Sequence, residues 1–129
     1  MKKPQGPTFD ELLPGMQAAF FEILWPTFRW IQSIWIKESK KSEFQLFVEA
    51  TATQDNKEWD DFDYLAGEVF KGVERLLDES APNSKHKIKH TIQHGPSVPK
   101  DHEYRELMSD RVFKKIAKKH APWRLDNGR

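Results

Sequence analysis

The sequence predicts an α+β fold in which helices pack mainly on one face of a small sheet. Two segments repeat apolar residues with the 3.6-residue period of an amphipathic helix, and a segment between them alternates with the period of two that a strand requires. At 129 residues the chain has the length of one ordinary domain. We therefore predict a single domain over 1–129 with the order α-β-β-α-β-α and about three strands in an antiparallel or mixed sheet.

The first predicted helix follows a flexible lead-in over residues 1–7. Thr8 and Glu11 form the capping-box pattern, and apolar side chains follow at helical spacing. Pro14 interrupts the pattern, because proline removes one backbone hydrogen bond and clashes with the preceding turn. We therefore expect a kink or two short helices, ending at Pro26.

The next two segments are predicted to pair as strands. Residues 28–37 fit either a helix or a strand, and their Trp and Ile side chains favour the strand because both are common in sheets. Residues 43–53 alternate clearly, with Phe44 and Leu46 on one face. The polar stretch 38–42 between these segments is typical of a hairpin loop.

The strongest helix signal covers residues 56–79. Asp55 and Glu58 occupy capping positions, and further acidic residues crowd the first turns, where negative charge suits the helix dipole. The apolar face of this helix matches the strand 43–53 in length, so we expect the two to share one core. The expected core residues are Phe44, Leu46, Val48, Phe62, Leu65, Val69 and Val73.

The last third of the chain is predicted to form a strand over 85–94, a helical region over 101–120 and a tail over 121–129. The helical region is either continuous or restarts at Ser109 and Asp110. As a strand, residues 85–94 place three histidines on one face: His86, His90 and His94. Successive histidines of this set are four residues apart, which separates their Cα atoms by ~13 Å on a strand, too far for one metal ion to join them. We therefore expect neither a metal site nor a cofactor.

Composition limits the class of protein. The chain has no cysteine, which excludes disulfides, thiolate metal sites and a cysteine nucleophile. No apolar run approaches the ~20 residues that a membrane helix needs, and the N-terminus lacks the apolar stretch of a signal peptide. These features predict a soluble, cytoplasmic protein that does not enter a membrane.

Charge is divided unevenly along the chain. Residues 1–82 carry 9 Lys and Arg against 15 Asp and Glu, whereas residues 83–129 carry 12 against 5. Either the two halves pack together and neutralise one another, or one of them forms a charged binding surface.

Two binding functions are consistent with this division. The leading hypothesis is a non-enzymatic protein that regulates or inhibits a protein partner through the acidic start of the second helix: Asp55, Glu58, Trp59, Asp60, Asp61 and Asp63. The alternative is a nucleic-acid-binding protein that uses segment 85–124, because lysines track phosphates and aromatic rings stack on bases. The residues of this alternative surface are Lys87, Lys89, Lys114, Lys115, Lys118, Lys119, Trp123 and Arg124.

A second alternative is a small hydrolase or nuclease that uses His and Glu side chains of the sheet. Glu49 lies on the more polar face of its strand, and a carboxylate beside an imidazole or ammonium group supports acid–base chemistry. The sequence has no phosphate-binding glycine loop, nucleophile elbow or zinc-protease motif. A non-enzyme is therefore favoured, no catalytic residue is assigned, and the oligomeric state stays open.

Overall fold

The computed structural model describes residues 8–40, 43–50, 54–80, 87–101 and 103–123. Within these residues the elements follow in this order: α1 (Phe9–Ala19), the π-helical segment η1 (Phe20–Leu24), α2 (Trp25–Thr27), β1 (Ser33–Lys40), β2 (Glu43–Glu49), α3 (Asn56–Ser80), β3 (Lys89–Gly95), β4 (Arg105–Ser109) and α4 (Asp110–His120). The strands form a mixed four-stranded sheet in the order β3-β2-β1-β4. The predicted α+β class is confirmed, with one strand more than expected.

The sheet is mixed because α3 crosses over between two strands. β1 runs antiparallel to both β2 and β4, whereas β2 and β3 run parallel, from Glu43 opposite Lys89 to Glu49 opposite Gly95. A parallel pair needs a long crossover connection, and α3 supplies it. β3 and β4 therefore form opposite edges of the sheet.

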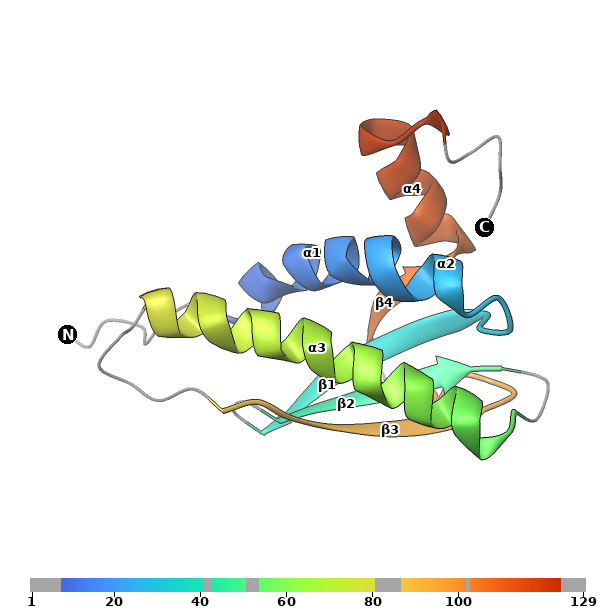
Figure 1. The fold of residues 1–129 in the computed structure, drawn as a ribbon, viewed down its shortest axis with the longest axis horizontal. Coiled ribbons are helices and arrows are strands. Elements are labelled where there is room, and N and C mark those ends of the chain that lie inside the picture. Colours follow the sequence, from blue (N-terminus) through green and yellow to red (C-terminus); the bar gives the residue numbers. More distant parts are fainter. Residues whose placement is uncertain (1–7, 41–42, 51–53, 81–86, 102, 124–129) are drawn as a thin grey trace.

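One face of the sheet carries the helix layer, in which α3 lies on one side of the segment α1–α2 and α4 on the other (Figure 1). Two neighbouring residues of η1 contact the helices on either side. The Phe20 ring lies 6.5 Å from that of Phe70 on α3, and the Phe21 ring stacks on Phe113 of α4 at 5.1 Å. The segment 9–27 therefore separates α3 from α4.

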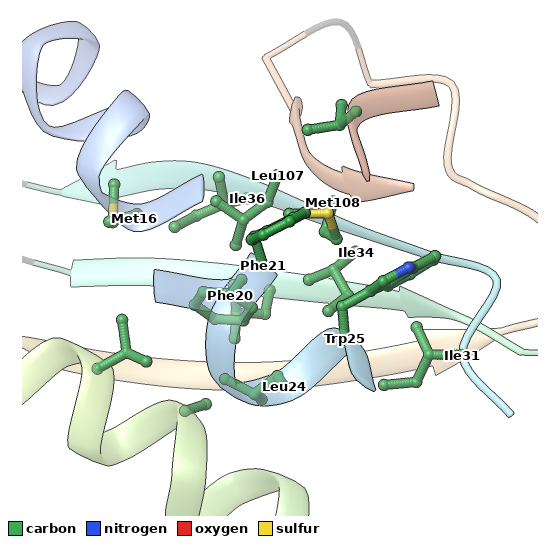
Figure 2. Close-up of a cluster of buried hydrophobic side chains, with 14 of the residues drawn as sticks. Met16, Phe20, Phe21, Leu24, Trp25, Ile31, Ile34, Ile36, Leu107 and Met108 are labelled. Atoms are coloured by element: carbon green, nitrogen blue, oxygen red, sulfur yellow. The ribbon is translucent and has the colours of Figure 1, made fainter. Parts of the chain in front are cut away.

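The core lies between this helix layer and the sheet (Figure 2). Large side chains of the segment 9–27 pack over the central strands: Met16, Phe20, Phe21, Leu24 and Trp25. Of the seven core residues expected from the sequence, all are buried except Leu65, which is half-buried against the same core. The shared core of the predicted strand and helix is thus confirmed for β2, which ends at Glu49, and α3. Residues 51–53 of the predicted strand lie outside the described residues.

The predicted helix over 101–120 is wrong in its first half, because Arg105–Ser109 form β4. The register of this five-residue strand shifts beside Ile34, and its neighbouring residues Leu107 and Met108 are both buried. A strand this short with an irregular register does not show the alternation by which strands are recognised. The helix begins only after Ser109, whose Oγ accepts from the Val112 N–H at 3.2 Å.

The predicted interruption of the first helix at Pro14 is also wrong. α1 runs through Pro14 without a break, and the backbone widens to a π-helix only at η1, just before Pro26. Pro26 has no N–H to donate, and the change of helical hydrogen-bond pattern lies in the turn directly before it. The ambiguous segment 28–37 is a strand from Ser33 onward, and the strand predicted over 85–94 begins at Lys89.

The connection from β3 to β4 crosses the helix-free face of the sheet. Lys37 on β1 forms an ion pair with Asp101 at 2.7 Å and lies 4.9 Å from the centre of the Tyr104 ring. Tyr104 also packs edge-on against Phe47 of β2, with ring centres 6.4 Å apart. These contacts hold the connection against the two central strands.

Replacing a core leucine should cost far more stability than replacing an exposed one. Leu46→Ala removes a fully buried side chain and is expected to lower the free energy of unfolding by about 2–5 kcal/mol. The matched substitution Leu76→Ala, at a side chain that is 58% exposed, should change it by about 0.5 kcal/mol or less. Urea melts measure both values, and equal losses would contradict the assigned core.

Alkaline pH should weaken the fold through Lys37 and Tyr104. The hydrogen bond that Lys37 donates to Asp101 raises the pKa of Lys37, and burial raises the pKa of Tyr104. Both groups therefore keep their protons in the folded state at pH values where the unfolded chain loses them. Their contribution to the free energy of unfolding is complete below a pH of about 10 and falls as the pH rises through the folded pKa values.

A pH series of urea melts tests this effect in the wild type and in the variant Lys37→Met/Tyr104→Phe. The wild type should lose stability more steeply above a pH of about 10 than the variant does. Two curves with the same alkaline slope would show that neither group has a raised pKa.

Candidate functional site

The helix α4 presents a basic face. Its opposite face is anchored, since Val112, Phe113 and Ala117 are buried. The lysines point away from this anchor and are all exposed: Lys114, Lys115, Lys118 and Lys119. None of them forms an ion pair with an acidic residue that the structure describes. Their position in the last turns of α4 suits the negative end of the helix dipole.

A cleft of about 460 Å³, here called the basic cleft, lies between α1, β4 and α4. Apolar residues of both helices form part of its lining: Leu13, Pro14, Ala18, Val112 and Ile116. The basic groups of the cleft come from β4 and α4: Arg105, Arg111, Lys115, Lys119 and His120. One carboxylate, Glu106, lies among them.

Carboxylates hold the two arginines of the basic cleft. Arg105 Nη2 pairs with Asp10 of α1, and Arg111 Nη2 pairs with Glu106 of β4. Glu106 also accepts a hydrogen bond from Ser109 Oγ, and its backbone carbonyl accepts one from Gln17 Nε2 at 3.0 Å. These contacts tie α1, β4 and the start of α4 together around the cleft.

An exposed aromatic ring follows α4. Ala121 is buried and ends the helix, and Trp123 two residues later is 64% exposed. A large exposed ring beside several lysines is the combination that single-strand binding surfaces use. Arg124, the last residue predicted for this surface, lies outside the described residues.

The basic segment 85–124 does not form one surface. Lys87 and Lys89 are exposed at β3, whereas α4 follows β4, and β1 and β2 lie between these two edge strands. The structure therefore brings together the lysines of α4 with Trp123 nearby, and places the other two lysines at the far edge.

The residues at the acidic start of α3 contact partners within the helix and on neighbouring segments. Asp55 accepts from the Glu58 N–H at 2.9 Å, and Glu58 accepts from Trp30 Nε1 at 3.1 Å. Trp59 stacks on His94 with ring centres 4.1 Å apart. Of the other predicted residues, Asp63 contacts His90 at 2.8 Å, Asp61 contacts Lys57 at 3.4 Å, and Asp60 is exposed.

A hollow of about 380 Å³, here called the acidic hollow, lies where α2 meets α3. Its lining combines two acidic residues with aromatic and apolar ones: Thr27, Phe28, Glu58, Asp61, Tyr64 and Leu65. Tyr64 is 66% exposed. Of the predicted acidic residues, only Glu58 and Asp61 belong to this hollow.

The His and Glu residues of the sheet do not meet. His90 and His94 lie on the helix-covered face, where they contact α3. Glu49 lies on the opposite face and accepts from Ser33 Oγ at 2.7 Å. A general acid and base must reach the same substrate, so these residues form no shared acid–base site. His86 lies outside the described residues.

The sequence reasoning missed Arg105 and Glu106 as members of a site. Both were placed in a helix that begins at residue 101, whereas they lie on β4 and contact α1 and α4. Ser109 followed by Asp110 is a helix-start signal, and it marks where the strand has to end. Within the described residues no group of three His, Asp or Glu side chains could hold a metal ion, and no described helix meets the length and apolarity needed to cross a membrane.

No family model matches the chain, and no curated protein matches it. Among solved structures it is similar to a chain in the structure of a tri-AMPylated Shewanella oneidensis HEPN toxin in complex with MNT antitoxin. The two chains are 16% identical, the match covers 89% of this chain and 92% of that chain, and the TM-score is 0.39. A likeness at this TM-score supports no conclusion about function.

Proposed function

We propose that the protein binds single-stranded nucleic acid along α4 and the basic cleft. The observation that carries this proposal is the position of the four lysines of α4, which are exposed and have no acidic partner among the described residues. Cationic side chains that stay free in the folded protein are available to neutralise phosphates.

The arrangement of the helices supports this proposal over mutual neutralisation of the two charged halves. The segment α1–α2 lies between α4 and the acidic α3 (Figure 1). Two acidic groups near the start of α3, Asp61 and Asp63, contact Lys57 and His90 instead. The charge of α4 is therefore not compensated by α3.

Removing two lysines of the basic cleft should change how binding depends on salt. Each phosphate neutralised in a single strand contributes about −0.7 to the slope of log K against log[salt]. Lys115→Gln/Lys119→Gln is therefore expected to weaken binding of a labelled oligo(dT) and to flatten the slope by about one to one and a half units. Fluorescence anisotropy across a range of salt concentrations measures both effects.

The chain offers a matched control with the same loss of charge. Lys87→Gln/Lys89→Gln removes two exposed lysines at the far edge of the sheet and should affect the slope much less. If both double variants changed the slope equally, the binding surface would not be α4. Trp123→Ala should weaken binding by ~1–3 kcal/mol without changing the slope, because the ring would stack on a base and neutralise no phosphate.

A second candidate function is the regulation or inhibition of a protein partner through the acidic hollow. The specific observation is that two carboxylates, Glu58 and Asp61, lie in the same hollow as the exposed ring of Tyr64. A lysine or arginine side chain of a partner would meet opposite charge and an aromatic face there, and a cation over an exposed ring contributes ~0.5–1 kcal/mol.

A labelled oligoarginine peptide tests this second function. Asp61→Asn/Tyr64→Ala should weaken peptide binding several-fold, because both changes fall within the hollow. Asp60→Asn removes the same charge at the neighbouring residue, which does not line the hollow, and should have a smaller effect. A larger loss for Asp60→Asn would reject the hollow as the binding site.

A further inference from the structure

The basic cleft gathers more hydrogen-bond donors than an internal phosphate of a nucleic acid needs. The guanidinium groups of Arg105 and Arg111 and the ammonium groups of Lys115 and Lys119 all line it. Each guanidinium has five N–H donors in a planar fork that fits phosphate oxygens, whereas an ammonium group acts as a point charge. Asp10 and Glu106 balance the charges of the two arginines, so the uncompensated charge comes from Lys115 and Lys119. These two positive charges exceed the single negative charge of a phosphodiester.

A phosphate monoester fits the same set better. It carries a charge of about −1.5 to −2 at neutral pH and three strong acceptor oxygens. In a nucleic acid such a group exists only at the end of a strand. The number and type of donors in the cleft therefore point to the end of a strand and away from its interior.

The two arginines are already oriented for such a ligand. Asp10 and Glu106 each engage one terminal nitrogen, Nη2, of an arginine. Among the described residues, no further acceptor engages the other N–H groups of these arginines. A side chain that is held in place loses less rotamer freedom when a ligand binds. The carboxylates thus act as positioning groups for Arg105 and Arg111.

The apolar lining and the size of the cleft suit the nucleoside that carries the phosphate. Leu13 and Pro14 of α1 face Ile116 of α4 across a space of about 460 Å³. Pockets for small organic ligands span roughly 300–1,000 Å³ and combine apolar walls with a few polar groups. One terminal nucleotide fits a space of this kind, with its base or sugar against the apolar wall.

We infer that the basic cleft binds the phosphorylated end of a single-stranded nucleic acid. The inference rests on the proposed nucleic-acid binding and adds a preference for one chemical group, the terminal phosphate monoester. The rest of the strand lies along the lysines of α4 outside the cleft.

Three forms of one oligonucleotide test the inference: 5′-phosphorylated, 3′-phosphorylated and without a terminal phosphate. We expect one of the phosphorylated forms to bind at least about tenfold more tightly than the unphosphorylated one, the factor expected from one additional charge-assisted hydrogen bond. Which phosphorylated form gains affinity identifies the end. Equal affinity for all three would overturn the inference and leave the proposed function standing, whereas no binding at low salt by any of them would overturn both.

Two variants show whether the cleft is responsible. Arg105→Lys/Arg111→Lys keeps the charge and removes the guanidinium forks, so the ratio between the phosphorylated and unphosphorylated affinities should fall to within about twofold of one. Lys114→Gln/Lys118→Gln removes charge from α4 outside the cleft and should weaken both forms by the same factor, with the ratio kept. A ratio that survives the arginine changes would place the preference elsewhere.

A competition experiment separates the strand end from a free nucleotide. AMP carries the same phosphate monoester without the strand, so it should displace the phosphorylated oligonucleotide only at much higher concentration. Displacement by AMP at a concentration equal to the Kd of the oligonucleotide would overturn the assignment to a strand end.

Discussion

The packing of η1 between two helices is the contact on which the arrangement of this protein depends. Phe20 and Phe21 are neighbours in the chain, yet one contacts Phe70 of α3 and the other stacks on Phe113 of α4. Both phenylalanines are buried, and aromatic side chains of this size contribute a large share of core stability. The same pair of contacts keeps the acidic helix and the basic helix on separate sides of the molecule.

This separation decides which charges are available for binding. If α4 packed against α3, its lysines would meet the carboxylates of the acidic half, and both sets would be neutralised. In the observed fold, Asp61 and Asp63 of α3 meet Lys57 and His90 instead. Only two cations near α4 have carboxylate partners among the described residues, Arg105 and Arg111, and in both cases the partner orients the group toward the basic cleft. The net charge of +1 therefore includes lysines on α4 that the acidic residues of α3 do not neutralise.

The elements predicted correctly from the sequence are those marked by capping residues or by an apolar period that extends over many residues. The capping residue Asp55 and the apolar period of helix 56–79 identified α3 to within a residue or two. The alternation after Glu43 identified the start of β2, which ends at Glu49. β4 was missed because it has five residues, an irregular register and no alternation, so its place depends on pairing with β1. Local patterns carry no information about such long-range pairing.

The residues of the candidate site also divide into those that local patterns identify and those that depend on long-range pairing. The lysines of α4 were identified because they repeat on one helix, and their grouping needs no knowledge of the fold. Arg105 and Glu106 could not be assigned to a site, since they reach the cleft only through the pairing of β4 with β1. Lys87 and Lys89 were assigned to the same surface because they are near in sequence, whereas the crossover at α3 places them at the opposite edge.

Repulsion between its lysines destabilises α4, and other contacts of the helix offset this repulsion. Lys115 and Lys119, and likewise Lys114 and Lys118, lie four residues apart, and like charges at this spacing repel one another on a helix. The cap at Ser109 and the stacking of Phe113 hold the helix at its start, and the last turn gains from the helix dipole. A bound phosphate would remove the remaining repulsion. Lys115 and Lys119 therefore leave the cleft with positive charge that no acidic partner balances among the described residues.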